Sequence, residues 1–270
     1  MGRALQTSYF FRNRRLFLLV DPYGDHCNRL FQSIHFHAYC LEHQLSFVNL
    51  GILGMLRQVP GAYLFLRDSL LFPFKVLART PCFGRFIRRL PPSRSFSPLV
   101  CVGGWGYRCH EHTQKYRSQL SRLYRLRHSL TEDELHLVEQ MQRARQAGSK
   151  VVGLHVRRGD YSSWQGGRYC FSDDAYASVV RSVRSQFSGQ GDHCFVVVFT
   201  NDAVAPSCGQ DLTAQGRWFA DLIGMQNCDL LVGPPSTFTL WASYSASVPY
   251  IHLQSVYDVI SLESASICSG

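Results

Sequence analysis

The sequence is most informative at residues 151–161, VVGLHVRRGDY. Val151 to Val156 is a short apolar run, which is typical of a buried strand, and two adjacent arginines follow it. A guanidinium stays charged and must be paired or solvated, so Arg157 and Arg158 cannot both point into an apolar core. We therefore expect at least one of them to face a cleft, where its planar fork suits a phosphate.

The same residues also allow a purely structural explanation. Arg157 and Asp160 are three positions apart, and an ion pair between them would only stabilise the end of the strand. Composition alone does not separate this ion pair from a phosphate site, so both interpretations stay open.

Strands and helices alternate on both sides of this stretch. We predict four strands, at Val151–Val156, Cys194–Phe199, Leu230–Val232 and Tyr250–Leu253. Helices are expected to start after Ser172 and Ser236, whose hydroxyls can cap them. This rhythm predicts a parallel sheet with helices on both faces, and such sheets bind ligands at the carboxyl ends of their strands.

The first half begins with a similar βα unit. A strand is expected at Leu16–Val20 and a helix from about Asn28 to Gln44, with a loop between them. In residues 51–99 only short helices can be assigned, and the cluster Gly103-Gly104-Trp105-Gly106 is predicted to be a loop. That cluster is too incomplete for a dinucleotide-binding fingerprint.

A second helix connects the two halves. Thr131 and Glu134 form a capping box for a helix that should stop at Gly148. We therefore place a domain junction there and predict an N-terminal α/β domain at 1–148 and a C-terminal Rossmann-like domain at 149–270. Two such domains facing each other across a cleft fit the length of 270 residues.

The composition is that of a globular protein, with 46% hydrophobic and 17% charged residues. No stretch approaches the roughly 18 apolar residues of a membrane-spanning helix, and none resembles a secretory signal. The ten cysteines are scattered without a C-x-x-C pair, so we expect core thiols in a reducing compartment and no zinc site. These features predict a cytoplasmic protein.

The net charge of +9 lies entirely in the N-terminal third. Residues 1–95 carry 13 Lys and Arg against 4 Asp and Glu, whereas the rest of the chain carries 15 of each. A non-enzymatic alternative is therefore a basic module that binds nucleic acid or an anionic membrane. Phenylalanines are interleaved with the arginines of this basic module, which are Arg12, Arg14, Arg15, Arg85, Arg88 and Arg89. For an enzyme, the same surface would allow peripheral contact with an anionic membrane, and nucleic acid is the less expected partner.

Four motifs in order resemble one enzyme family. HVRRGDY at 155–161 is similar to the H-x-R-R-x-D motif of the α1,2-fucosyltransferases and their α1,6- and protein O-fucosyltransferase relatives. CNRLFQ at 27–32 resembles G-N-Q-x-F-Q, and the strand that ends in Thr200-Asn201-Asp202 is also similar to the family. The fourth motif resembles D-x6-C followed by S-T-F-x-x-W-x-A-Y, and it consists of Asp221, Cys228, Ser236, Thr237, Phe238, Trp241, Ala242 and Tyr244.

The resemblance implies a fold and a reaction. The fold would be α/β and GT-B-like, with two facing Rossmann-like domains and parallel sheets. The reaction would be transfer of L-fucose from GDP-fucose to a glycan hydroxyl with inversion, in this case to a galactoside in α1,2 linkage. The partners would be a GDP-sugar donor and a glycan acceptor. A related transferase that uses another nucleotide sugar remains an alternative.

The resemblance also implies roles for individual residues. Arg157 would hold the β-phosphate of GDP, and Asp221 would accept from the guanine N1–H and N2 amine. The remaining substrate-binding residues would be His155 and Arg158 beside the nucleotide, Ser236, Thr237 and Phe238 at the diphosphate, and Asn28 near diphosphate and sugar. Where relatives carry G-N-Q, this chain has Cys27-Asn28-Arg29, so the acceptor side is expected to differ.

No metal ion or other cofactor is expected. The sequence contains no D-x-D, the motif with which many sugar-nucleotide enzymes hold a divalent ion. A fixed arginine and a helix N-terminus can stabilise a departing diphosphate without one. Asp160 is the motif carboxylate, and the resemblance allows it to act as the catalytic base, to recognise fucose or to orient the arginine. Asp25 and His26 are rival candidates for the base.

Overall fold

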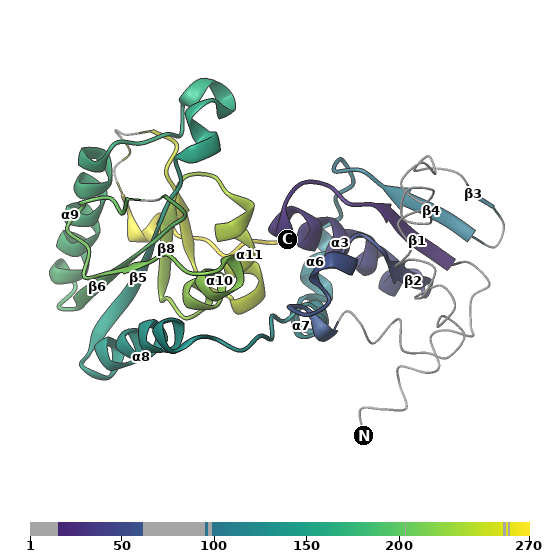
Figure 1. Ribbon diagram of the computed structural model, residues 1–270, viewed down its shortest axis with the longest axis horizontal. Helices are drawn as coiled ribbons and strands as arrows, with labels where there is room; N and C mark the ends of the chain where they lie inside the picture. Colours follow the sequence, from purple (N-terminus) through teal and green to yellow (C-terminus); the bar gives the residue numbers. More distant parts are fainter. Residues whose placement is uncertain (1–15, 62–94, 97–98, 203, 256–257, 259) are drawn as a thin grey trace. The chain divides into compact units, whose positions relative to one another are not determined.

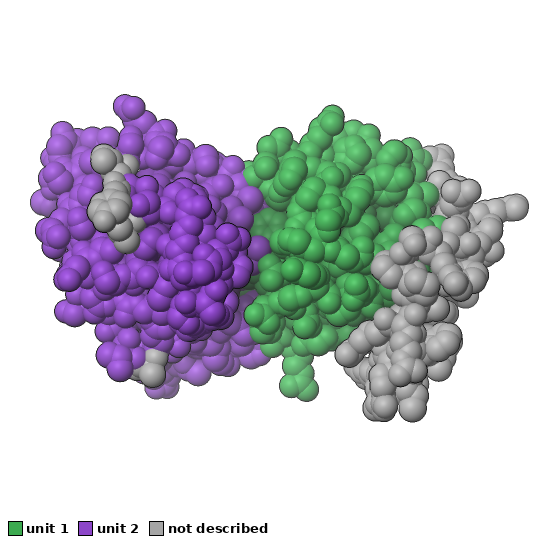
Figure 2. All heavy atoms as spheres, turned by 90° about the horizontal axis from the view of Figure 1, so that it is seen from above, with its two compact units in different colours: residues 1–127, 269–270 green, residues 128–268 purple. Residues whose placement is uncertain are grey.

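The computed structural model describes residues 16–61, 95–96, 99–202, 204–255, 258 and 260–270. The chain divides into two compact units, with residues 1–127 and 269–270 in unit 1 and residues 128–268 in unit 2 (Figure 2). Each unit is built around its own sheet, with strands and helices that alternate along the chain (Figure 1).

Unit 2 contains a five-stranded sheet in which every neighbouring pair is parallel. Its order is β7-β6-β5-β8-β9. The strands are β5 (Ser149–Val156), β6 (His193–Thr200), β7 (Leu212–Ala214), β8 (Leu230–Gly233) and β9 (Tyr250–His252). The four predicted strands and the parallel sheet are therefore confirmed. The sequence did not predict β7, because a three-residue edge strand is too short to show a pattern.

Helices cover both faces of this sheet. They are α8 (Glu132–Gln146), α9 (Asp173–Gly189), α10 (Trp218–Gln226) and α11 (Thr237–Ala246), with short 3₁₀ turns at Gly159–Ser162, Trp164–Gly167 and Leu262–Ser264. α9 lies on one side of the sheet, and α10 and α11 lie on the other (Figure 1). The predicted caps are confirmed: the Ser172 hydroxyl accepts from the Ala175 N–H at 3.3 Å, and α8 starts with the capping box.

The side chains of β5 alternate between these two sides. Val152, Leu154 and Val156 pack into one core cluster with residues of α9. His155 points the other way, where its Nδ1 lies 2.9 Å from the Thr239 hydroxyl of α11. β5 is therefore covered on both faces, which is the physical reason that residues 151–156 are all buried and mostly apolar.

Unit 1 contains a four-stranded sheet of order β2-β1-β4-β3. β1 pairs in parallel with β2 and β4, and β3 pairs with β4 antiparallel. The elements are β1 (Leu16–Asp21), α3 (His26–Glu42), β2 (Ser46–Asn49), a 3₁₀ turn (Leu53–Met55), β3 (Ser95–Phe96), β4 (Leu99–Gly103), α6 (His110–Lys115) and α7 (Arg117–Leu123). The predicted βα unit is present as β1 and α3.

The division between the units differs from the predicted junction at residue 148. α8 belongs to unit 2, because Arg145 pairs with Asp229 at 3.1 Å and Glu134 pairs with Arg217. A glycine that ends a helix is visible in a sequence, but the sheet against which that helix packs depends on distant residues.

Most of the described cysteines behave as small core residues. None of the nine described cysteines is in a disulfide, and six of them are buried. Cys82 lies outside the described residues, as do Arg12, Arg14, Arg15, Arg85, Arg88 and Arg89 of the basic-module alternative. Within the described part of the chain, no helix is both long and apolar enough to cross a membrane.

We expect Gly233→Ala to destabilise unit 2. A Cβ at this position would lie 2.6 Å from the His155 carbonyl oxygen and 2.9 Å from the His155 Cβ, so β5 and β8 would have to move apart. Overpacking of this kind costs about 1–3 kcal/mol of the free energy of unfolding, measurable by urea titration. The control is Gly189→Ala at the end of α9, where a Cβ meets nothing within 4 Å. Equal stability of both variants would contradict this close approach of the two strands.

Candidate functional site

The carboxyl edge of the unit 2 sheet gathers most of the residues that the sequence singled out. Because β5, β6 and β8 are parallel neighbours or near neighbours, their carboxyl ends meet at one edge. Arg157 and Arg158 directly follow β5, Asp202 follows β6, and Ser236 lies just beyond β8 at the start of α11. Segments that are far apart in the sequence thus contribute to one edge.

Arg157 forms the ion pair that the structural explanation anticipated. Its Nε and Nη2 both donate to the two carboxylate oxygens of Asp160, each at 3.1 Å. The guanidinium also lies 5.0 Å from the ring centroid of Tyr161, whose hydroxyl donates to the Pro235 carbonyl. The Arg157 side chain is 26% exposed and that of Asp160 is 60% exposed, so the pair lies at the surface of this edge.

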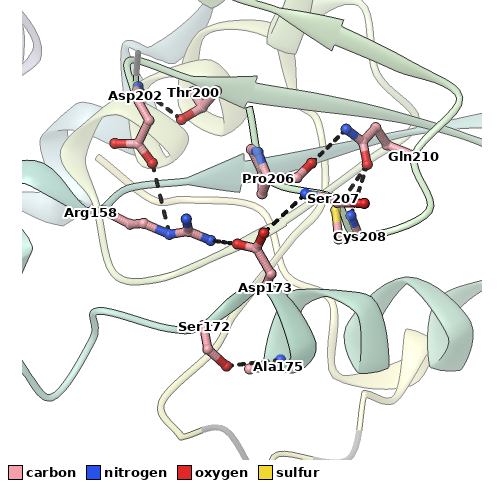
Figure 3. Close-up of polar contacts among 10 residues, drawn as sticks. All are labelled: Arg158, Ser172, Asp173, Ala175, Thr200, Asp202, Pro206, Ser207, Cys208 and Gln210. Carbon is pink, nitrogen blue, oxygen red and sulfur yellow. Dashed lines mark hydrogen bonds and ion pairs between the residues drawn. The ribbon is translucent and has the colours of Figure 1, made fainter. Parts of the chain in front are cut away.

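Arg158 points toward α9. Its guanidinium pairs with Asp173 in the first turn of α9 and lies 3.8 Å from the Asp202 carboxylate (Figure 3). Asp173 also accepts from the Ser207 N–H at 3.1 Å. Both donors lower the pKa of Asp173, the Arg158 guanidinium most strongly. Sequence reasoning placed Arg158 at the nucleotide, whereas its contacts in the structure join α9 to the loops after β6.

The start of α11 is fixed by its own cap residue and by a side chain of β5. The Ser236 hydroxyl accepts from the Phe238 N–H at 3.2 Å, so Ser236 caps the helix as expected. His155 is buried, lies against the Phe238 ring and is hydrogen-bonded to Thr239. Burial lowers the pKa of His155 to about 3, and it is therefore neutral at physiological pH. Thr237 is the first residue of the helix.

Asp221 is a buried carboxyl group in the first turn of α10. It is 8% exposed and accepts from the Gly216 N–H at 2.9 Å. Burial raises its pKa to about 7, although the hydrogen bond from Gly216 acts in the opposite direction, and the nearby Glu134 carboxylate raises it further. A group with this pKa changes its charge within the physiological range, which is typical of functional sites.

Glu134 is a residue of this region whose second role sequence reasoning did not find. It completes the capping box of α8, and its carboxylate also accepts from the Arg217 guanidinium before α10. Hydrogen bonds from Arg217 are the main reason that its pKa falls to about 2. The capping pattern was visible in the sequence, but the partner on a distant loop gave no signal.

The predicted unit 1 residues lie at the carboxyl end of β1. Asp25 and His26 are exposed at the start of α3, and Asn28 lies in its first turn. Gly24 has a φ of +61°, and a Cβ there would lie 2.4 Å from the Asn28 Nδ2, so only glycine fits this turn. Arg29, which replaces the glutamine of the family pattern, donates to the Gly24 carbonyl at 2.8 Å.

A match to a protein family covers most of unit 2 and the last part of unit 1. The sequence model described as Glycosyl transferase family 11 matches residues 101–256, which is more than half of the chain. The chain belongs to glycosyl transferase family 11. This confirms the resemblance to fucosyltransferases that the motifs indicated. Trp241 and Tyr244 of the last motif are fully buried in α11, as packing residues should be.

Solved structures similar to this member of the family include two fucosyltransferases. A mutant of Arabidopsis thaliana FUT1 in complex with GDP is 13% identical, has a TM-score of 0.50, and covers 88% of this chain and 70% of its own. The fucosyltransferase NodZ from Bradyrhizobium is 13% identical, with a TM-score of 0.45 and coverage of 89% and 96%. No curated protein matches the chain. The expected fold class, α/β and GT-B-like with parallel sheets, is confirmed.

Among the residues that the structure describes, no group of three or more His, Cys, Asp and Glu side chains is arranged to hold a metal ion. The expectation of a metal-independent family member stays a prediction.

We expect Arg158→Ala to reduce the stability of unit 2. The variant leaves the partly buried Asp202 carboxylate and the Asp173 carboxylate without their guanidinium, which costs about 2 kcal/mol for hydrogen bonds to a charged group. Thermal unfolding measures this effect. Arg143→Ala is the control, because Arg143 forms an exposed ion pair with Glu139 worth less than about 1 kcal/mol. Equal melting temperatures of the two variants would contradict the role of Arg158 in joining α9 to the loop after β6.

Proposed function

We propose that this protein transfers L-fucose from GDP-fucose to a glycan hydroxyl, with inversion and without a metal ion. The acceptor in this proposal is a galactoside, and the linkage is α1,2. Membership of glycosyl transferase family 11 supports the reaction class. The GDP-bound state named for the Arabidopsis FUT1 structure supports a guanine nucleotide as the donor part. The observation that carries the proposal is the oriented Arg157 guanidinium at the carboxyl edge of the unit 2 sheet.

Arg157 is the group that would stabilise the departing diphosphate. Breaking the bond between sugar and phosphate leaves negative charge on GDP, and a catalyst must bind that charge most strongly in the transition state. Asp160 occupies the edge of the guanidinium formed by Nε and Nη2. A guanidinium has a second edge, formed by Nη1 and Nη2, and in the proposal this edge binds the β-phosphate.

The start of α11 would complete the diphosphate site. A helix N-terminus carries partial positive charge and suits a phosphate. The Ser236 hydroxyl accepts from the Phe238 N–H, and a hydroxyl that accepts one hydrogen bond can also donate one. The Tyr161 hydroxyl donates to the Pro235 carbonyl, which connects the loop of Arg157 with the residue before Ser236. Thr237 and Phe238 belong to this site because they lie in the first turn of α11.

Asp221 would read the guanine base. Its carboxylate form can accept from both N1–H and the N2 amine, which no adenine or uracil edge can offer together. His155, Arg158 and Asn28 complete the set of substrate residues carried over from the family. Of these, Arg158 is assigned a positioning role through Asp173 and Asp202, because its contacts are with those carboxylates.

Asp160 is assigned the orientation of Arg157. Both of its oxygens accept hydrogen bonds from that guanidinium, so the carboxylate fixes the direction in which the guanidinium points. Asp25 and His26 on unit 1 are then the candidates for the base that deprotonates the acceptor hydroxyl.

The assay that tests the proposal is release of GDP from GDP-fucose in the presence of galactoside acceptors, with and without EDTA. We expect equal turnover with and without EDTA. Arg157→Ala should lower kcat by on the order of 10²–10³, as loss of one group that stabilises transition-state charge does. The control is Arg168→Ala, which removes the same charge from an exposed side chain in the same loop. Turnover that EDTA abolishes, or that Arg157→Ala retains, would overturn the proposal.

The pKa of Asp221 predicts a pH-dependent affinity for GDP. Below pH 7 the carboxyl is mainly protonated and cannot accept both guanine hydrogens, so the affinity should rise about tenfold between pH 6 and pH 8. Asp221→Asn should bind GDP more weakly, without this rise. Titration of the phosphate itself affects both proteins equally and cancels in the comparison.

The raised pKa of Asp221 also affects the free energy of unfolding, which it increases at low pH, whereas the affinity for GDP increases at high pH. The folded-state pKa of Asp221 lies above its ordinary value near 4, so the folded protein binds more protons between about pH 4 and pH 7. Its contribution to the free energy of unfolding is therefore largest in acid and is lost as pH rises to 7. Denaturant titrations across this range should show that loss in the wild type and not in Asp221→Asn.

A further inference from the structure

Two aromatic rings lie at the carboxyl edge of the unit 1 sheet, outside the residues used so far. Tyr23 follows β1, and Trp105 follows β4, the parallel neighbour of β1. Their ring centroids are 4.9 Å apart and the ring planes differ by 20°, so the rings are stacked. Tyr23 is 46% exposed, so much of its side chain is accessible to solvent. We name this pair the aromatic platform.

A buried side chain holds the two loops of the platform together. Gln32 of α3 is 1% exposed and accepts from the Tyr23 N–H at 3.1 Å. Its amide nitrogen donates to the Asp21 carbonyl at 2.6 Å and to the Gly104 carbonyl at 3.2 Å. One amide thus binds the loop after β1 and the loop after β4, so the relative position of the two rings is fixed by the core of unit 1.

Arg108 fixes the indole ring. Its guanidinium carbon lies 3.8 Å from the Trp105 ring centroid, and its Nη1 donates to the carbonyls of Trp105 and Tyr107 at 2.5 and 2.8 Å. A cation held against the indole attracts its π electrons and stabilises the ring in place. Tyr23 is the exposed member of an arrangement whose other parts are held by hydrogen bonds.

An exposed aromatic ring that is held rigidly is suited to a sugar. The face of an aromatic ring carries partial negative charge and attracts the axial C–H groups on one face of a pyranose. Rigid aromatic side chains lose little conformational entropy on binding, so the contact is favourable even when it is small. Asp25 and His26 are exposed in the same loop as Tyr23 and can hydrogen-bond to sugar hydroxyls.

We propose that the aromatic platform of Tyr23 and Trp105 is a subsite that binds a pyranose ring of the acceptor glycan by stacking on Tyr23. The role of the subsite in catalysis rests on the proposed fucosyltransferase function. The evidence that the subsite is present is the geometry of unit 1. It also gives a function to the Gly103-Gly104-Trp105-Gly106 cluster, in which Gly104 has a φ of +85° and presents its carbonyl to Gln32.

The test measures sugar binding and transfer separately. Saturation-transfer NMR with methyl β-D-galactopyranoside and with lactose is carried out on the full chain and on Tyr23→Ala, Tyr23→Phe and Trp164→Ala. Trp164 is the matched control, because it is 41% exposed and lies in unit 2. Transfer from GDP-fucose gives the KM for lactose and the KM for GDP-fucose of each variant.

We expect Tyr23→Ala to lose the saturation signal of one pyranose face and to raise the KM for lactose about tenfold, with the KM for GDP-fucose unchanged. Tyr23→Phe and Trp164→Ala should retain both the signal and the KM for lactose. Unchanged lactose binding in Tyr23→Ala, equal loss in Trp164→Ala, or a higher KM for GDP-fucose alone would overturn the subsite.

Failure of the two proposals can be told apart. If neither the wild type nor any variant binds GDP or transfers fucose, but lactose binds the wild type and not Tyr23→Ala, the subsite stands and the fucosyltransferase proposal fails. If transfer occurs and Tyr23→Ala is indistinguishable from the wild type, the reaction stands and the subsite fails.

Discussion

The alternation of side chains along a strand is the constraint on which unit 2 depends. β5 lies in the middle of a parallel sheet with helices on both faces, so successive residues must serve opposite sides. The two arginines that follow β5 have different partners. Arg158 turns to α9 and meets Asp173, whereas Arg157 meets Asp160. Two adjacent guanidinium groups would repel each other, and this arrangement gives each its own carboxylate. Arg158 joins α9 to the loop after β6, and the ion pair of Arg157 lies at the surface of the edge.

The ion pair of Arg157 and the phosphate site are compatible in this arrangement. At the sequence level they were alternatives, because a paired arginine is usually a structural one. In the structure, Arg157 and Asp160 are three residues apart in the sequence, and the Asp160 side chain is exposed. Both hydrogen bonds of the pair use the same edge of the guanidinium. The Asp160 carboxylate binds one edge of the guanidinium and so restricts the rotamers of the Arg157 side chain. This reduces the conformational entropy that would be lost if a ligand bound the other edge. Exposed ion pairs contribute little to stability, so orientation is the effect with the larger consequence.

Polar side chains in both units connect segments that are far apart in the sequence. Gln32 joins the loops after β1 and β4, and Glu134 joins the start of α8 to Arg217 before α10. Gln32 acts at the carboxyl edge of the unit 1 sheet, and parallel sheets bind ligands at such edges. Asp221 is a buried carboxyl whose charge is poorly stabilised, since it accepts from one backbone N–H and lies near the Glu134 carboxylate.

The sequence by itself determined the strands of unit 2 other than β7 and the helix caps at Thr131, Ser172 and Ser236, because each of these depends on residues close together in the chain. It also determined the family, because each motif is a short stretch of sequence. It also named Arg157, Asp160 and Asp221 as one set. It could not show which face Arg158 would take, that α8 packs with unit 2, or that Tyr23 and Trp105 would stack. Those outcomes depend on contacts between residues tens of positions apart, and only the pairing of parallel strands brings such residues to one edge. Local preference fixes the elements, and packing between distant elements decides the partners of each side chain.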